Sequence, residues 1–188
     1  MGVEINPATE RDTLDVKEFL SGQGASDFSV ATAARVISRI EDGTVLVARN
    51  NKDEVVGVGS VLPPPLLRAS GLAHALLDKP ESGMVAHISH FVVHARLDAG
   101  AKKEVATRLL SAMVDEASSA KHIVANTREG TNDGVFAKIF EGHGFKSQTD
   151  GVKTTQPATI LVRENANPSP LPPKSVLSHL PSGRYGNG

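Results

Sequence analysis

Three histidines lie close together in the segment MVAHISHFVVHA, and imidazoles are well suited to proton transfer or metal binding at neutral pH. In a regular β-strand His87 and His90 point to opposite faces, because side chains alternate. His90 and His94 share a face but lie about 13 Å apart at ~3.3 Å per residue, which is too far to chelate one ion. We therefore expect no metal site. His87 or His90 could act as a general base, or could be a partly buried histidine bonded to backbone.

A second candidate region is DAGAKKEVA (98–106), where small residues and lysines precede a long apolar stripe. The first N–H groups of a helix have no partner within the helix, and its dipole is positive at that end. A helix that starts here would therefore favour an anion. Lys102, Lys103 and Arg108 are either contacts for that anion or part of a solvated helix face.

The elements that must position these residues follow from the apolar periodicity. Their order, β-α-α-β-β-β-α-β-α-β, predicts an α/β (α+β) fold with a mixed central sheet flanked by helices. The segment 84–95 reads as a central strand, since neither of its faces is purely polar. We expect strands over 3–5, 44–50, 54–63, 84–95, 122–127 and 158–164, and an irregular connection over 63–83. We expect helices within 6–22, closed by Gly22, over 30–43, over 102–120, and from Val135 to the glycines of EGHGF.

Some local features can also be predicted. Asp12 or Thr13 should cap the first helix, whose apolar face we assign to Leu14, Phe19 and Leu20. The NKD segment (51–53) should join a β-hairpin. The glycines of EGHGF should end the last helix by adopting positive φ.

Composition bounds the class of protein. The chain has 188 residues, no cysteine, and a net charge of -1. This length suits one domain, or one domain with a tail. The missing cysteines exclude disulfides and thiolate sites and fit a reducing, cytoplasmic location or an intracellularly assembled particle. The near-neutral charge and the lack of a long apolar run argue against nucleic-acid and membrane partners.

The composition changes at Asn165, which divides the chain into a domain over 1–164 and an extended tail over 165–188. The tail is rich in proline and carries no acidic residue. It is either a disordered end or a docking arm that binds another protein or a second copy of the chain. In an arm, Val176, Leu177 and Leu180 would be the apolar anchors.

Four segments together resemble the GNAT superfamily of N-acetyltransferases: EINPATERD, EVVGVGSV, HISHFVVHARLDAGAKKEVATRLLSAMVDEA and NDGVFAKIFEGHGFK. The resemblance covers about residues 3–164. It implies acetyl-CoA as cofactor, an amine of a small molecule or a protein as acceptor, and two parallel strands near 85–94 and 122–127 that splay apart. It also implies that backbone N–H groups near Val92 and Val93 hold the thioester carbonyl.

The family's pyrophosphate loop resembles Q/R-x-x-G-x-G/A and can be aligned here in two ways. In one, AKKEVA (101–106) puts Glu104 at a glycine position and Ala106 at the last small position, with Val105 between them. In the other, DAGAKK (98–103) puts Gly100 and Ala101 in the loop and uses Lys102 and Lys103 for the phosphates. The sequence does not choose between them, and a carboxylate at 104 would repel a phosphate.

Two more positions depend on the resemblance. The family commonly has a tyrosine, four residues before the glycine of Gly-Phe, that protonates the departing thiolate; here that residue is Phe140, which has no proton to give. An asparagine near Asn126 or Asn132 often contacts the pantetheine arm. Asn132 could equally form an Asx turn and cap the following helix.

Two functions therefore stay open. The first is an acetyl-CoA-dependent N-acyltransferase, in which the amine attacks the thioester directly. The second is a GNAT-fold protein without catalysis that serves as a structural or docking subunit of a larger assembly. Glu104, Phe140 and the tail favour the second function, and the family resemblance favours the first.

Overall fold

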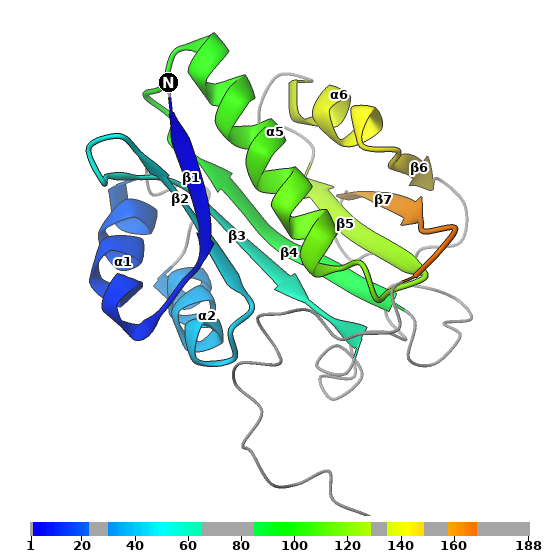
Figure 1. Ribbon diagram of the computed structural model, residues 1–188, viewed down its shortest axis with the longest axis horizontal. Helices are drawn as coiled ribbons and strands as arrows, with labels where there is room; N and C mark the ends of the chain where they lie inside the picture. The colour runs from blue at the N-terminus through cyan, green and yellow to red at the C-terminus, as the bar shows by residue number, and fades with distance from the viewer. Residues whose placement is uncertain (1, 23–29, 65–84, 129–134, 149–157, 169–188) are drawn as a thin grey trace, which may run out of the picture.

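The computed structural model describes residues 2–22, 30–64, 85–128, 135–148 and 158–168, which form a seven-stranded mixed sheet with helices on both faces (Figure 1). Of the strand pairs described, that between β4 and β5 is parallel and the others are antiparallel. The mixed sheet predicted from the sequence is confirmed. In sheet order the strands are β1 (Val3–Pro7), β2 (Val45–Asn50), β3 (Val55–Leu62), β4 (Val85–Val93), β5 (His122–Arg128), β7 (Ala158–Glu164) and β6 (Lys146–Gln148).

Two apolar clusters hold the helices on the sheet. One joins the sheet to α5 (Ala99–Glu116) and α6 (Val135–Gly142), through residues such as Leu109 and Met113. The other joins the opposite face to α1 (Thr13–Gly22) and α2 (Val30–Glu41), through residues such as Val16 and Val58. Strands β3 and β4 each contribute residues to both clusters, so they pack against the helices on both faces of the sheet.

The N-terminal helix differs from the prediction. A 3-10 turn, η1 (Glu10–Asp12), precedes α1, and Thr9 forms a capping box with Asp12, so neither Asp12 nor Thr13 caps α1 as predicted. Leu14 is 63% exposed, and Val16 takes its place in the core. The reason is spacing: Val16, Phe19 and Leu20 follow the i, i+3, i+4 stripe, and Leu14 lies off it.

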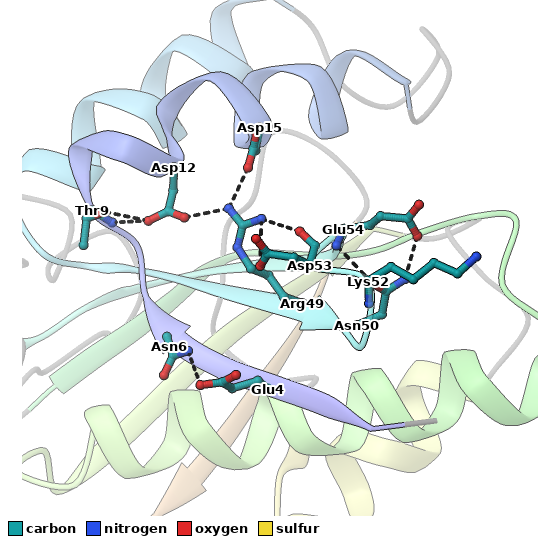
Figure 2. A network of polar contacts seen from close by, with 10 residues as sticks. All are labelled: Glu4, Asn6, Thr9, Asp12, Asp15, Arg49, Asn50, Lys52, Asp53 and Glu54. Carbon is teal, nitrogen blue, oxygen red and sulfur yellow. Dashed lines mark hydrogen bonds and ion pairs between the residues drawn. The ribbon is translucent and has the colours of Figure 1, made fainter.

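Figure 2 shows how this turn is fixed to the β2–β3 hairpin. Arg49 Nη2 lies 2.7 Å from both Asp12 Oδ1 and Asp15 Oδ2, and its Nη1 donates to the Asp53 carbonyl. Partial burial alone would raise the pKa of Asp12, but hydrogen bonds from Thr9 and Arg49 outweigh it and lower that pKa. One guanidinium thus ties η1 and α1 to the turn at 51–53, where Asp53 has φ 63°.

The long helix begins three residues earlier than the 102 predicted and ends at Glu116 rather than 120. Asp98 caps it by accepting a hydrogen bond from Ala101 N at 2.9 Å, which turns the following residues into the helix. The buried side chains of α5 lie against β3. Gly57 and Gly59 of β3 have no side chains, so the helix can approach the strand closely. A Cβ on Gly57 would lie 3.1 Å from Val105 Cγ1.

The end of α6 follows the prediction in part. Gly144 has φ 82° and lets the chain reverse, while Gly142 is the last helical residue and does not have positive φ. Phe145 N donates to Phe140 O at 3.1 Å, and Phe145 then packs in the core. The short strand β6 follows directly at Lys146. The irregular connection, Asn132 and tail residues 169–188 lie outside the described residues.

In the described segments, no helix combines the length and the apolar character needed to cross a membrane.

Candidate functional site

The parallel strands β4 and β5 stop pairing part of the way along their length. They pair from Val85–His122 to Ile88–Ala125, and beyond that point β5 pairs with β7 and β4 pairs with β3. The sequence-based expectation of two parallel strands that separate is therefore confirmed. Because His94 N donates to Val56 O in β3, alternation directs the N–H groups of Phe91 and Val93 to the β5 side. Within the described residues, no strand pairs with that edge.

The edge therefore offers backbone donors and acceptors to an extended ligand. Of the two residues predicted to hold a carbonyl, Val93 has its N–H on this side and Val92 has its N–H toward β3 by the same alternation.

A β-bulge lies where the pairing ends. The register of β4 against β3 shifts between Ile88, opposite Val61, and His90, opposite Ser60, so Ser89 is the extra residue. Ala86 and Ile88 face α5 before the bulge, and Phe91 and Val93 face α5 after it.

The prediction that His87 and His90 point to opposite faces is therefore wrong. The bulge reverses the alternation of side chains, so both histidines lie on the face covered by α1 and α2. Even so, no group of three potential ligands suited to a metal ion is found among the described residues.

Arg39, in the last turn of α2, reaches this bulge. Its Nη1 donates to Ser89 Oγ and lies 3.3 Å from Ser60 Oγ and 3.2 Å from His90 Nδ1. The backbone carbonyl of Arg39 is itself held by Thr44, through N and Oγ1 at 3.2 Å each. Since a guanidinium only donates, a hydrogen bond between Arg39 and His90 requires Nδ1 of His90 to be the acceptor.

His87 is the buried member of this region. It is 8% exposed, and neither of its ring nitrogens has a hydrogen-bond partner among the described residues. Burial and the charge of Arg39 lower the pKa of His87 to about 4. His87 is therefore neutral at physiological pH and has an imidazole nitrogen that can accept a proton.

The start of α5 bears on the two alignments of the pyrophosphate loop, AKKEVA and DAGAKK, without fully deciding between them. The N–H of Lys102 already bonds within the helix, to Asp98 O, so the amides of residues 104–106 lie inside it. Ala99 and Gly100 have their N–H groups at the open end, whereas Ala101 N is taken by the Asp98 carboxylate.

The remaining residues predicted here lie in the first turns of α5. Lys102 Nζ donates to Ala95 O at 3.2 Å, and Lys103 is exposed. Glu104 lies 3.9 Å from Arg108, one turn along the helix. Val105 and Ala106 are fully buried against the sheet, where they serve the core.

Phe140 is a core residue in this structure. It is 3% exposed, and its ring packs edge-on against Phe91 and Phe145, with centroids 5.5 and 5.1 Å apart. Asn126 lies in β5 opposite Ile160.

Sequence reasoning missed Arg39, Ser60, Ser89 and Asp98. The available signal was a serine inside each of two mainly apolar strands, together with a helix whose last turn carries an arginine. Nothing in the one-dimensional pattern indicated that the two serines pair across a bulge.

No protein-family model matches this sequence, and a search of curated proteins finds no match. Similar structures do exist. The mosquito arylalkylamine N-acetyltransferase-like 5b superposes with TM-score 0.62 at 14% identity, covering 87% of this chain and 100% of that one. A GNAT-family acetyltransferase from Bacillus cereus gives 0.62 at 12% identity, covering 88% and 99%.

A third structure is that of YncA from Salmonella typhimurium, which holds its cofactor acetyl-CoA. It gives TM-score 0.58 at 18% identity and covers 91% of this chain and 100% of its own. Identities this low establish the fold and not the reaction. The superpositions over most of both chains show that this chain has the GNAT fold.

Proposed function

We propose that this protein is an N-acyltransferase that moves an acetyl group from acetyl-CoA to an amine. The observation that carries the proposal is the edge of β4 beyond Ile88, which no described strand pairs, with a neutral buried histidine beside it. The fold is shared with a protein whose structure contains acetyl-CoA, which supports the same cofactor here.

The strand edge fits the pantetheine arm of the cofactor. That arm contains amide groups, and the edge at Phe91 and Val93 offers backbone N–H and C=O groups of the kind that pair with amides. The N–H of Val93 would orient the carbonyl of the acyl group. Bound acetyl-CoA would supply an activated thioester.

The phosphate end fits less well. The amides of Ala99 and Gly100, with Lys102 and Lys103, would hold the pyrophosphate, as in the DAGAKK alignment. The carboxylate of Asp98 caps the same helix end and repels an anion. We therefore expect weak cofactor affinity.

His87 would accept the proton that the amine loses. An alkylammonium with a pKa near ~10 cannot protonate an imidazole with a pKa of about 4, so the amine must arrive neutral. Once the amine has attacked, its nitrogen is far more acidic and can pass a proton to the His87 ring. His90 is the weaker candidate, because its Nδ1 already accepts from Arg39.

The test is release of free thiol from acetyl-CoA in the presence of a panel of primary amines. The chain contains no cysteine, so a thiol reagent reports only the product. We expect turnover with at least one amine, reduced by about a hundredfold in His87→Gln, since general-base catalysis contributes ~10²–10⁴-fold. His122→Gln, at the far end of β5, is the matched control and should retain activity. If no amine of the panel supports thiol release, the proposal is wrong.

A second function, a structural or docking subunit without catalysis, is favoured by two observations. Asp98 occupies the helix end with its own carboxylate, and Phe140 replaces a proton donor with a packed ring. In that case the tail over 165–188 would be the docking arm. The protein would then bind no acetyl-CoA at millimolar concentration.

A further inference from the structure

The guanidinium of Arg39 is fixed by one of its nitrogens and leaves the others available. Its Nη1 contacts Ser60, Ser89 and His90, which come from β3 and β4. Within the described residues, Nη2 and Nε donate no hydrogen bond. An arginine held in this way presents a second edge in a defined orientation, which is the geometry that binds a planar anion through two donors.

The charge of this cluster is not balanced locally. The groups that contact Arg39 are two hydroxyls and an imidazole, and no carboxylate in the described parts of the chain forms an ion pair with it. Burial and the nearby charge of Arg35 lower the pKa of Arg39, and the charge of Asp42 opposes that shift only in part. A partly buried cation without a counter-ion is destabilising, so binding an anion would be favourable.

The cluster is also partly exposed to solvent, next to the point where β4 and β5 separate. Arg39, Ser89 and His90 are partly exposed, whereas Ser60 and His87 are buried beneath them. Ser89 is the bulge residue at the point where β4 leaves β5. The cluster therefore lies on the α2 face of the sheet, beside the opening between the two strands.

His87 provides an independent indication of a ligand. Its ring is buried on the same face, and both of its nitrogens lack partners among the described residues. Buried polar atoms in native proteins normally have a partner. A polar group that reaches past Arg39 toward the opening would supply one.

We propose that Arg39, with Ser89, binds the carboxylate of the acceptor, so that the substrates are small amines that also carry a carboxylate, such as amino acids. This rests on the proposed function, because it assigns the acceptor side of that same site. The carboxylate at Arg39 would direct the amine toward His87 and the gap between β4 and β5. The cofactor, along the β4 edge, would meet it there.

The charge of the cluster favours a carboxylate over a phosphate. One guanidinium and neutral hydroxyls match a single negative charge. A phosphate monoester carries nearly two charges at neutral pH and is usually met by more than one cation. A carboxylate and a phosphate both present anionic oxygens to the arginine, and the experiment distinguishes the two groups.

The test compares three probe types with the full chain: amino acids, the corresponding amino-acid amides, and phosphoethanolamine. Turnover is followed by thiol release from acetyl-CoA, and binding is followed separately by the ligand-induced shift in melting temperature without cofactor. We expect free carboxylates to exceed their amides by about ten- to a hundredfold in kcat/KM, the effect of one charge-assisted contact.

Two variants locate the effect. Arg39→Gln should abolish the preference for the carboxylate. Arg39→Lys should retain only part of it, because an ammonium keeps the charge but lacks the two parallel donors of a guanidinium. Arg35→Gln removes an exposed arginine one turn earlier on α2 and should leave the preference intact. Melting of each variant without ligand shows that it is folded.

The outcomes distinguish the two proposals. If amides are used as well as carboxylates, or if Arg39→Gln keeps the preference, the carboxylate site is wrong while the acyltransferase stands. If no amine is acetylated but amino acids shift the melting temperature in wild type and not in Arg39→Gln, the site stands and the acyltransferase fails. If phosphoethanolamine is preferred, the assignment to a carboxylate is overturned.

Discussion

At the scale of single residues, His87 is defined by what surrounds it rather than by its type. It stands at a regular strand position, paired with both neighbouring strands. Its burial and the nearby charge of Arg39 give it a pKa of about 4. Its neutral form is therefore stable over the whole physiological range.

This burial predicts acid sensitivity. An unfolded histidine titrates near 6.5 and His87 in the folded protein near 4, so the unfolded state binds the proton first as pH falls. Stability should be constant above pH 6.5 and should fall by about 3 kcal/mol between pH 6.5 and 4, at 1.36 kcal/mol per pKa unit. Urea unfolding across this range measures the change.

The comparison is with His87→Gln, which removes the titrating group. That variant should lose about 3 kcal/mol less than wild type over the same interval, whatever its stability at pH 7. His122→Gln should follow wild type. Parallel pH profiles for wild type and His87→Gln would show that the ring is not buried as described.

At the scale of elements, the site depends on how closely α5 approaches β3. Gly57 lies beneath Val105 and Leu109, and a Cβ there would come within 3.1 and 3.3 Å of their side chains. Gly57→Ala should therefore cost about 1–3 kcal/mol of unfolding free energy, as overpacking does in other cores. Chemical denaturation measures it.

The matched control is Gly142→Ala, where a Cβ meets nothing within 4 Å. Gly142 is helical, so alanine there should be neutral or slightly stabilising, by up to ~1 kcal/mol. Equal effects of the two substitutions would contradict the close contact between α5 and β3.

The cap of α5 gives a second prediction at this scale. Asp98→Asn keeps a residue that caps helices well and removes the negative charge. It should tighten acetyl-CoA binding several-fold with little change in stability, if the pyrophosphate lies at Ala99 and Gly100. Calorimetry measures the affinity. Asp115→Asn, in the last turns of α5, is the control and should not change it.

Glu104→Gln tests the other alignment in the same assay. Glu104 lies beyond the open helix end and near Arg108, so we expect a smaller effect than at Asp98. A larger gain at Glu104 than at Asp98 would favour the AKKEVA alignment.

How much the sequence predicted differs between these scales. Periodicity predicted most of the strands and the helices, because apolar stripes such as those of β4 and α5 are long and regular, whereas the parallel pair was implied by the resemblance to the GNAT superfamily. The prediction placed Leu14 on the wrong face, because the buried stripe of α1 follows Val16, Phe19 and Leu20 and Leu14 lies off it. The faces of β4 could not be predicted beyond Ile88, since one extra residue in the register reverses them and leaves the composition unchanged.

The candidate site was predicted only where it is local in sequence. His87 and the start of α5 were found because each lies within one segment. The cluster of Arg39, Ser60 and Ser89 joins three elements, and its residues are up to 50 positions apart. Contacts of that kind depend on tertiary packing and leave no short motif.

At the scale of the whole molecule, the described structure continues past β7 into the segment where the composition changes. Asn165 follows β7 and is tied to the turn after α5, with N bonded to Lys121 O at 2.8 Å and Nδ2 to Ala120 O at 2.7 Å. These two bonds hold Asn165 against the turn after α5. The docking arm over the rest of the tail stays a proposal.

A truncation tests that proposal. A chain that ends after Pro168 keeps the Asn165 contacts, so it should melt as the full chain does. If the tail docks on another copy or on a partner protein, the truncated chain should no longer form the assembly that the full chain forms. Size-exclusion chromatography with light scattering, on both chains, measures this. Identical sizes would contradict the docking arm.

The most direct test of the central claim is calorimetric titration of the full chain with acetyl-CoA. An acyltransferase that uses the open edge of β4 must bind this cofactor, even with Asp98 at the helix end. We predict saturable binding with one site per chain and a Kd below about 1 mM, or roughly 4 kcal/mol of binding free energy. No binding at several millimolar acetyl-CoA, in a protein that melts cooperatively, would contradict the account.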